Sequence, residues 1–222
     1  MTDLELTALW LAILATGLLT CIALHAIGLA TTYVRDLLHV GAGIWIAGWP
    51  HWNAALAPVA ITLAAVLAVI AVPLVAPHLG LAARLRDAVS NGDELWDGLI
   101  VYVASYSALT TLGLTAAAFP AAAGLLALSL GDGIGGAVGR RFGHHRFRTP
   151  WGKRKSVEGA LAVAVAASCG VMLAARLFDQ PTSPALVAGL GVLAAAVEAL
   201  SPRSTDNLLV PAAVWAGASL CT

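Results

Sequence analysis

Charged residues are scarce in this chain of 222 residues. Asp, Glu, Lys and Arg make up 11% of it, hydrophobic residues make up 59%, and the mean hydropathy is +0.86. Soluble domains carry about 25% charged residues, so the composition argues against a soluble protein and predicts an integral membrane protein. Acidic and basic residues number 12 each, and the zero net charge therefore gives no evidence about binding partners.

Cysteines and N-terminal cations are also few. The three cysteines, Cys21, Cys169 and Cys221, lie far apart in apolar segments, without the spacings of zinc, haem or CxxC redox sites. The first thirty residues contain neither Lys nor Arg, and their apolar run is longer than the h-region of a signal peptide. We therefore expect this segment to be retained as a membrane span.

Long apolar runs dominate the rest of the sequence. A helix needs about 20 apolar residues to cross a bilayer, and candidate runs lie at 4–30, 38–50, 54–77, 96–131, 157–178, 184–200 and 207–221. The run at 96–131 is too long for one span, so we expect two helices with a turn between Gly113 and Pro120. The sequence therefore predicts one all-α domain over residues 1–222, a polytopic membrane helix bundle with about seven to eight transmembrane helices.

Basic residues are concentrated in one place. Seven of the 12 Lys and Arg residues fall between positions 140 and 155. Basic residues favour cytoplasmic loops, so we expect this segment in the cytoplasm and both termini on the other side. Alternating the spans then brings residues 35–39, 131–159 and 198–207 to the cytoplasmic surface. A site for a water-soluble anion and a lipid requires such convergence, although any cytoplasmic face is charged.

The stretch LSLGDGIGGAVGRRFG contains a formal GxGxxG pattern at Gly131, Gly133 and Gly136. It does not indicate a dinucleotide fold, because it follows an apolar helix and not a strand, and the chain has no Walker A motif. We interpret it as a glycine-dense turn that begins at Asp132, where backbone N–H groups and cations bind phosphate and Asp132 binds Mg²⁺. Close helix packing is the alternative for the glycines, and attraction to anionic lipids is the alternative for the cations.

Two further polar clusters accompany this stretch. Glu198 stands in the last turn of an apolar segment, and Asp206 and Asn207 open the next one. Ionisable residues at membrane depth indicate function, although Asp206 could instead cap its helix. Arg35 and His39 are four residues apart and share a helical face. A neutral interfacial side chain is the alternative for His39.

Three motifs occur in a fixed order from about residue 31 to the end of the chain: RDLLHVGAG, then GDGIGGAVGRRFGHHR with GKRKSVEGALA, then VEALSPRSTDNLLVP. Together they resemble the CTP-dependent lipid-alcohol kinases, the family of dolichol kinase, phytol kinase and CTP-dependent diacylglycerol kinase. The last motif is the most specific. The first departs from the family, since Asp36 stands where a lysine is usual and Thr32 where an acid is frequent.

The resemblance implies transfer of the γ-phosphoryl group of CTP to the hydroxyl of a polyprenol or another isoprenoid or lipid alcohol, at the cytoplasmic face of the membrane. It also implies Mg²⁺ as cofactor. The expected partners are the lipid alcohol, the nucleoside triphosphate and membrane lipids, without nucleic acid, and a homodimer stays open.

We hypothesise a site of three groups of residues. The catalytic residues are Asp132, Asp206, Glu198 and Lys155, with Asp206 or Glu198 taking the proton of the alcohol, and the metal ligands are Asp132 and Asp206. The residues expected to bind nucleotide and phosphate are Gly131, Gly133, Gly136, Gly139, Arg140, Arg141, Lys153, Lys155, Ser156, Glu158, Asn207, Arg35 and His39. For Ser156 and Glu158, capping of the following helix is the alternative.

Two other functions are compatible with the sequence. CDP-diacylglycerol synthases share a glycine-rich Asp turn and a basic segment, so a CDP-lipid-forming cytidylyltransferase is the nearest alternative. The C-terminal motif here lacks the long acidic and lysine-bearing signature of that family. A transporter of an anionic solute is the second alternative, but we find no internal repeat, and the charges gather at one face and not at the midplane. The sequence identifies neither the alcohol nor the nucleotide base.

Overall fold

The chain is almost wholly helical, as its apolar runs predict. A computed structural model describes residues 1–90, 93–202 and 204–221. In chain order the elements are α1 (Asp3–Ala26), α2 (Thr31–Ala42), the 3-10 helix η1 (Gly43–His51), α3 (Leu56–Val75), α4 (Gly80–Val89), α5 (Asp93–Thr115), α6 (Ala118–Phe142), β1 (Arg146–Arg148), β2 (Arg154–Ser156), α7 (Val157–Leu177), α8 (Pro184–Leu200) and α9 (Asp206–Ser219).

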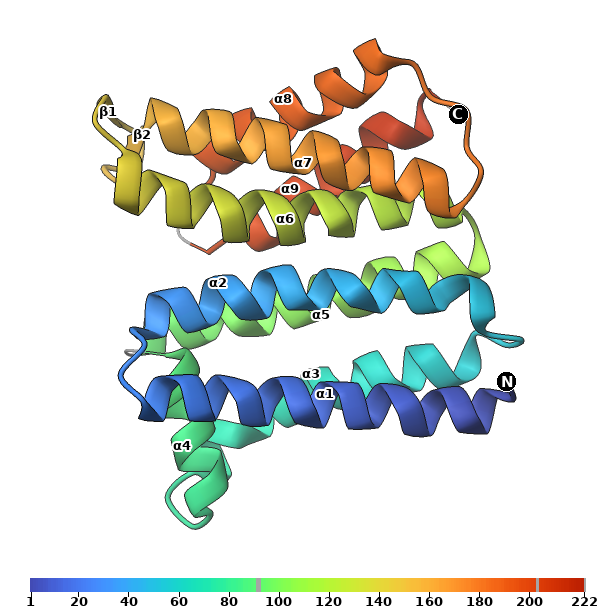
Figure 1. Cartoon of the computed structure of the whole chain (residues 1–222), viewed down its shortest axis with the longest axis vertical. Coiled ribbons are helices and arrows are strands. Elements are labelled where there is room, and N and C mark those ends of the chain that lie inside the picture. The colour runs from blue at the N-terminus through green and yellow to red at the C-terminus, as the bar shows by residue number, and fades with distance from the viewer. Residues whose placement is uncertain (91–92, 203, 222) are drawn as a thin grey trace.

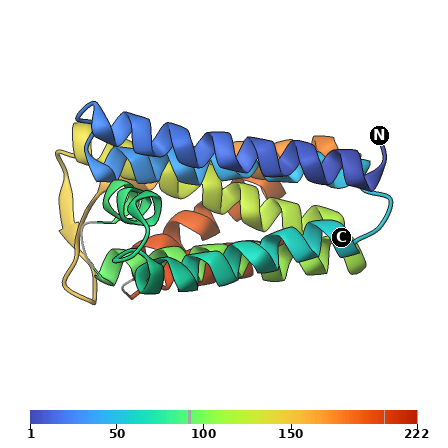
Figure 2. The ribbon, with the colours of Figure 1, turned by 90° about the horizontal axis from the view of Figure 1, so that it is seen from below.

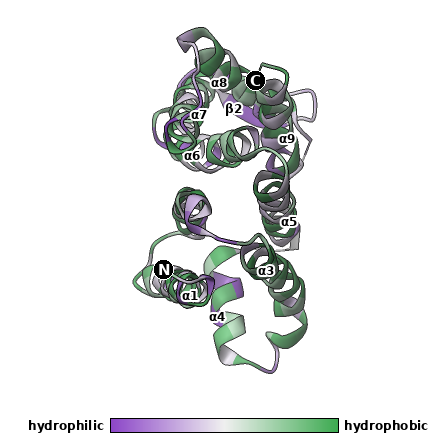
Figure 3. Cartoon of the chain, turned by 90° about the vertical axis from the view of Figure 1, so that its right-hand side faces the viewer, coloured by the Kyte–Doolittle hydropathy of each residue, from purple (hydrophilic) through white to green (hydrophobic). Residues whose placement is uncertain are grey.

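The long helices run side by side along one direction (Figures 1 and 2). Within the described residues, α1, α3, α6, α7 and the part of α5 from Trp96 onward are long and apolar enough to cross a membrane, and α8 is a shorter apolar helix. Hydrophobic residues cover most of these helices, whereas hydrophilic residues gather at α4 and β2 (Figure 3). The prediction of an all-α membrane helix bundle is therefore confirmed.

Both termini lie at one end of the bundle, and the β1–β2 hairpin lies at the other (Figure 1). The sequence predicted this separation of the termini from the basic segment. The predicted break in the run 96–131 is also confirmed, because α5 ends at Thr115 and α6 begins at Ala118. The predicted span at 38–50 is wrong as a separate helix, since these residues form the end of α2 and η1, which follow one another without a gap.

The predicted glycine-dense turn after Gly131 is wrong. Helix α6 continues through this stretch to Phe142, and the loop begins only at Gly143. The reason is close packing: a Cβ added at Gly135 would lie 2.2 Å from Cγ2 of Val163 in α7, and one added at Gly133 would lie 2.9 Å from the carbonyl oxygen of Asp36 in α2. The glycines therefore let two helices approach α6, and this contact offsets the cost of glycine inside a helix.

The basic segment forms a two-stranded antiparallel hairpin with two unlike faces. Phe147 is paired with Lys155, and Arg148 is paired with Arg154. Side chains alternate between the faces of a strand, so Phe147 and Lys155 are half-buried while Arg148 and Arg154 are exposed. The pairing thus turns Lys155 toward the helices and the arginines toward the surroundings.

Helix α6 lies at the centre of the bundle and packs against α7, α9, α2 and α5. Its first half is buried, and the buried hydroxyls of Tyr102 and Tyr106 from α5 gather around Ser129. Asp132 follows one turn later, where α6 leaves this core and approaches the hairpin end. The packing of α6 therefore fixes the position of Asp132 relative to four neighbouring helices.

Candidate active site

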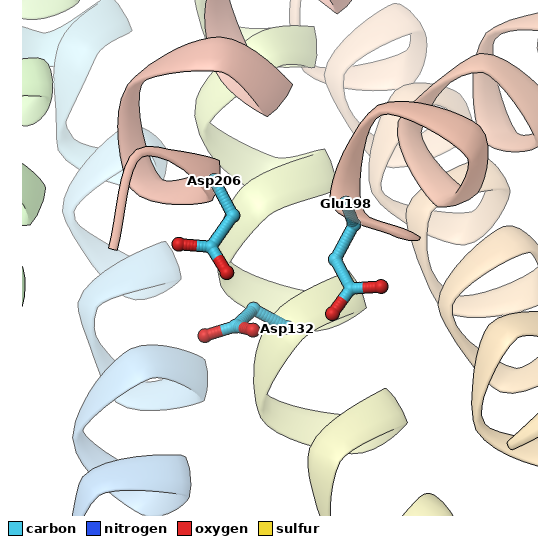
Figure 4. A group of neighbouring side chains, drawn as sticks. All are labelled: Asp132, Glu198 and Asp206. Atoms are coloured by element: carbon cyan, nitrogen blue, oxygen red, sulfur yellow. The ribbon is translucent and has the colours of Figure 1, made fainter. Parts of the chain in front are cut away.

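Three carboxylates from three different helices meet at the hairpin end of the bundle. Asp132 comes from the middle of α6, Glu198 from the last turn of α8 and Asp206 from the first residue of α9, and their side chains point toward one another (Figure 4). One oxygen from each lies within 4.8 Å of the others, and all three residues are partly buried. Carboxylates this close repel one another when ionised, so the cluster requires positive charge nearby.

Lys155 supplies part of that charge. Its Nζ donates to the carboxylate of Glu198 and also to the backbone carbonyl of the same residue. The Lys155 and Glu198 side chains are only 17% and 15% exposed. The hairpin is fixed to α8 a second time by Trp151, whose Nε1 donates to the carbonyl oxygen of Leu200 at 2.9 Å. The hairpin therefore sits on the end of α8, with its inner face over the carboxylates.

A polar cavity of about 210 Å³ opens beside the cluster. Its cations are Arg35, Arg140 and Lys153, and its acids are Asp36, Asp132 and Asp206. The remaining lining residues are polar or small: Thr32, His39, Gly136, Ser204 and Asn207. The cavity therefore joins residues from all three sequence motifs in one place.

Arg140 is held by an ion pair that the sequence did not suggest. Its guanidinium binds the carboxylate of Asp36, which lies 104 positions earlier in the chain, and it also lies over the ring of Tyr33, 5.2 Å from the ring centre. A Cβ at Gly136 would lie 3.1 Å from the guanidinium and 3.4 Å from the Asp36 carboxylate. Gly136 thus leaves room for this pair between α2 and α6.

Sequence reasoning missed Ser204, which precedes α9, as a cavity residue, and it also missed Asp36 and Thr32. Both lie on the face of α2 that also carries Arg35 and His39, because positions 32, 35, 36 and 39 follow the three-and-four spacing of a helix. This spacing is the feature of the sequence from which Asp36 and Thr32 could have been assigned to the same face as Arg35 and His39. In the sequence, Asp36 stands out only as a departure from the family lysine, because its partner Arg140 lies 104 positions away.

His39 is buried behind the carboxylates. Its Nδ1 faces the carbonyl oxygen of Arg35 at 2.9 Å, and its Nε2 lies 3.6 Å from Oδ2 of Asp132. Tyr102 packs its ring edge-on against the imidazole, with 4.2 Å between ring centres, and donates its hydroxyl to the backbone carbonyl of His39 at 3.1 Å. The position of the imidazole is therefore fixed on two sides.

Asn207 anchors the start of α9. Its amide Nδ2 donates to the carbonyl oxygen of Gly98 in α5 at 2.8 Å, and its backbone N–H donates to Oδ1 of Asp206 at 3.1 Å. Asn207 is 4% exposed, and a buried side-chain amide that satisfies a backbone carbonyl fixes the two helices relative to one another. It therefore sets the position of Asp206.

Other predicted nucleotide-binding residues lie outside the cavity. Gly131 faces α7, Gly133 faces α2, and Gly139 faces Ser156 and Gly159 at the start of α7. Ser156 accepts from the backbone N–H of Gly159 at 3.1 Å, so it caps α7, which was its alternative interpretation. Three further residues do not line the cavity: Lys155 pairs with Glu198, Glu158 pairs with Nδ1 of His145 at 2.6 Å, and Arg141 lies near the ring of Phe142.

The cluster suits a small divalent cation. Its three carboxylates are hard oxygen ligands, which Mg²⁺ prefers, and a cation would relieve their mutual repulsion. The cavity next to them carries three cations that can bind phosphate. The arrangement can therefore hold a metal ion and a polyphosphate side by side.

Comparison with known proteins gives one relative. No family model and no solved structure match the chain. A phytol kinase from Synechocystis sp. is 32% identical over an alignment that covers 96% of this chain and 94% of the relative. Because the identity extends over almost the whole of both proteins, the chain belongs to the lipid-alcohol kinase family of which phytol kinase is a member.

Proposed function

We propose that this protein transfers the γ-phosphoryl group of CTP to the hydroxyl of an isoprenoid alcohol, with phytol as the first candidate. The observation that carries the proposal is the meeting of Asp132, Glu198 and Asp206 beside a cavity that holds three cations. Phosphoryl transfer depends on positioning and on neutralising the charge of the transferred group. The site offers carboxylates that can hold a metal ion and cations that can bind phosphate, and the two groups lie side by side.

Asp132 and Asp206 would hold Mg²⁺, with Glu198 as the third neighbouring carboxylate. When bound, the ion would neutralise charge on the phosphate oxygens. Arg35 and Lys153 line the cavity and would bind the phosphates directly. Arg140 would do so by exchanging its contact with Asp36 for a phosphate oxygen.

Asp206 is the carboxylate that we assign to the alcohol. It lines the cavity, whereas the carboxylate of Glu198 is bound by Lys155, and a carboxylate bound by an ammonium group is the poorer proton acceptor. A carboxylate has two oxygens, so Asp206 can face the metal with one and the hydroxyl with the other. Asn207 holds Asp206 in this position through Gly98.

The alcohol would approach from the membrane, with its chain along the apolar helices and its hydroxyl in the cavity. The basic hairpin would then face the cytoplasm, because basic loops favour that side. CTP would reach the cavity from water, and the lipid would reach it from the bilayer. The position of the cavity at the hairpin end of the long apolar helices supports this arrangement.

The test is phosphate transfer from γ-labelled CTP, compared with ATP and GTP, by purified protein in detergent. Phytol, geranylgeraniol, farnesol, an undecaprenol and diacylglycerol serve as acceptors. We expect labelled phytyl phosphate or another labelled prenyl phosphate, with CTP as the best donor, and loss of product in Asp132→Asn. Phosphatidic acid is included as a lipid-phosphate acceptor: its conversion to an unlabelled CDP-lipid, with release of labelled pyrophosphate, would instead identify a cytidylyltransferase.

A further inference from the structure

One ring nitrogen beside the carboxylates lacks a hydrogen-bond partner. His39 is 4% exposed, and within the described part of the chain its Nε2 makes no hydrogen bond. Buried polar atoms are nearly always paired, so an unpaired one requires an explanation. This nitrogen points toward Asp132, whose Oδ2 lies 3.6 Å away.

The contacts of the ring define which nitrogen carries the hydrogen. Nδ1 faces the carbonyl oxygen of Arg35 at 2.9 Å, and a carbonyl only accepts, so Nδ1 donates its N–H. The neutral ring then has its free lone pair on Nε2. Tyr102 holds the ring in place through its edge contact and its hydroxyl, so the lone pair stays directed at the carboxylates.

A lone pair and a carboxylate oxygen at this separation repel one another, and a cation between them would relieve that repulsion. Two ligands of one small divalent ion, each bound at about 2.1 Å, lie about 3 to 4 Å apart, which matches the distance of 3.6 Å between Nε2 and Oδ2. A histidine that ligates a metal almost always donates its other N–H to a carbonyl or carboxylate. His39 makes that second contact through Nδ1.

We propose that His39 and Asp132 share one divalent ion on the His39 side of the carboxylate cluster, where Nε2 lies close to Asp132 but outside the group of three carboxylates that meet within 4.8 Å. This inference rests on the proposed function, which places a divalent cation there. With His39, the metal ligands would comprise a nitrogen atom as well as the carboxylate oxygens. An imidazole ligand favours transition-metal ions over Mg²⁺, so the site binds Mn²⁺ more tightly than Mg²⁺.

The test is electron spin-echo spectroscopy on the full protein in detergent, loaded with Mn²⁺ as the probe. We expect modulation from a directly bound imidazole nitrogen in the wild type and its loss in His39→Phe, which keeps a ring of similar size. The matched control is His51→Phe, at the exposed end of η1, which keeps the signal. Competition of Mg²⁺ against Mn²⁺ measures the selectivity, and we expect the Mn²⁺ preference of the wild type to fall about tenfold in His39→Gln.

Mn²⁺ bound without imidazole coupling, and released by Asp132→Asn, would overturn the proposal, because the carboxylates alone would then hold the ion. Failure to bind Mn²⁺ at all would also overturn it. The proposed function fails separately. Imidazole coupling without phosphate transfer to any alcohol would refute the kinase activity and support His39 as a ligand. Phosphate transfer without imidazole coupling would support the kinase activity and refute His39 as a ligand.

Discussion

Lys155 in β2 and Glu198 in α8 form a nearly buried ion pair that joins the hairpin to the acidic cluster. The lysine also donates to the backbone carbonyl of Glu198. It therefore neutralises the carboxylate and holds the last turn of α8 in position. Among the seven cations between residues 140 and 155, this is the one that neutralises a cluster carboxylate directly. The outer arginines of the same hairpin are exposed.

Lys155→Met will destabilise the protein. Removing one member of a buried pair leaves the other charge uncompensated, which costs about 3 kcal/mol in free energy of unfolding. Unfolding in detergent measures the loss. The double variant with Glu198→Gln should recover part of it, and Arg154→Met, on the exposed face of the same strand, should change stability by less than about 0.5 kcal/mol. Equal losses of stability in Lys155→Met and Arg154→Met would contradict the ion pair between Lys155 and Glu198.

Asp132→Asn and Asp206→Asn should each lower kcat by at least about 100-fold, because each removes a carboxylate to which the proposed mechanism assigns the metal ion or the alcohol. The measurement is phosphate transfer at saturating CTP over a range of Mg²⁺ concentrations. Asp179→Asn is the matched control: this exposed residue follows α7 with a φ of 49°, a conformation that Asn adopts well. Activity retained in the two cluster variants would contradict their assignment.

Substitutions of Arg140 and of its neighbour Arg141 will have different effects on KM for the nucleotide. Arg140→Gln removes a cavity cation and should raise KM for the nucleotide roughly tenfold, whereas Arg141→Gln, which lies outside the cavity, should leave KM nearly unchanged. Asp36→Asn frees Arg140 from its partner and should lower KM for the nucleotide. Initial rates over a range of CTP concentrations separate the three variants. A higher KM in Asp36→Asn would show that the ion pair positions Arg140 for phosphate and does not hold it back.

Gly135→Ala will destabilise the α6–α7 contact, since the added Cβ would lie 2.2 Å from Val163. We expect a loss of about 2 kcal/mol, relieved in part by Val163→Ala. Gly189→Ala in α8 meets no atom within 4 Å and should instead raise stability by about 0.5 to 1 kcal/mol through its higher helix propensity. Unfolding in detergent compares the variants. No loss in Gly135→Ala would show that α7 does not pack this closely.

The sequence predicted the parts of this structure that depend on long apolar runs. It located the break near Thr115 and the separation of the termini from the basic segment, because span length and charge decide both. Convergence of Asp132, Glu198 and Asp206 at one end also followed from alternating the spans. Their separation of less than 4.8 Å depends on packing that no local pattern reports.

The errors have physical causes. Glycine occurs both in tight turns and where helices pack closely. The stretch from Gly131 to Gly139 is a case of close packing, so a helix stands where the sequence predicted a turn. The role of Asp36 depends on Arg140, which lies 104 positions away. The inward direction of Lys155 depends on its register with Phe147 in the hairpin, which the spacing of the cations did not indicate.

Phosphate transfer from γ-labelled CTP to phytol tests the central claim most directly, with wild type, Asp132→Asn and Asp179→Asn measured in parallel. The account predicts labelled phytyl phosphate from the wild type and from Asp179→Asn, and none from Asp132→Asn. It would be contradicted by wild-type protein that is folded and binds CTP but labels neither phytol nor any other isoprenoid alcohol.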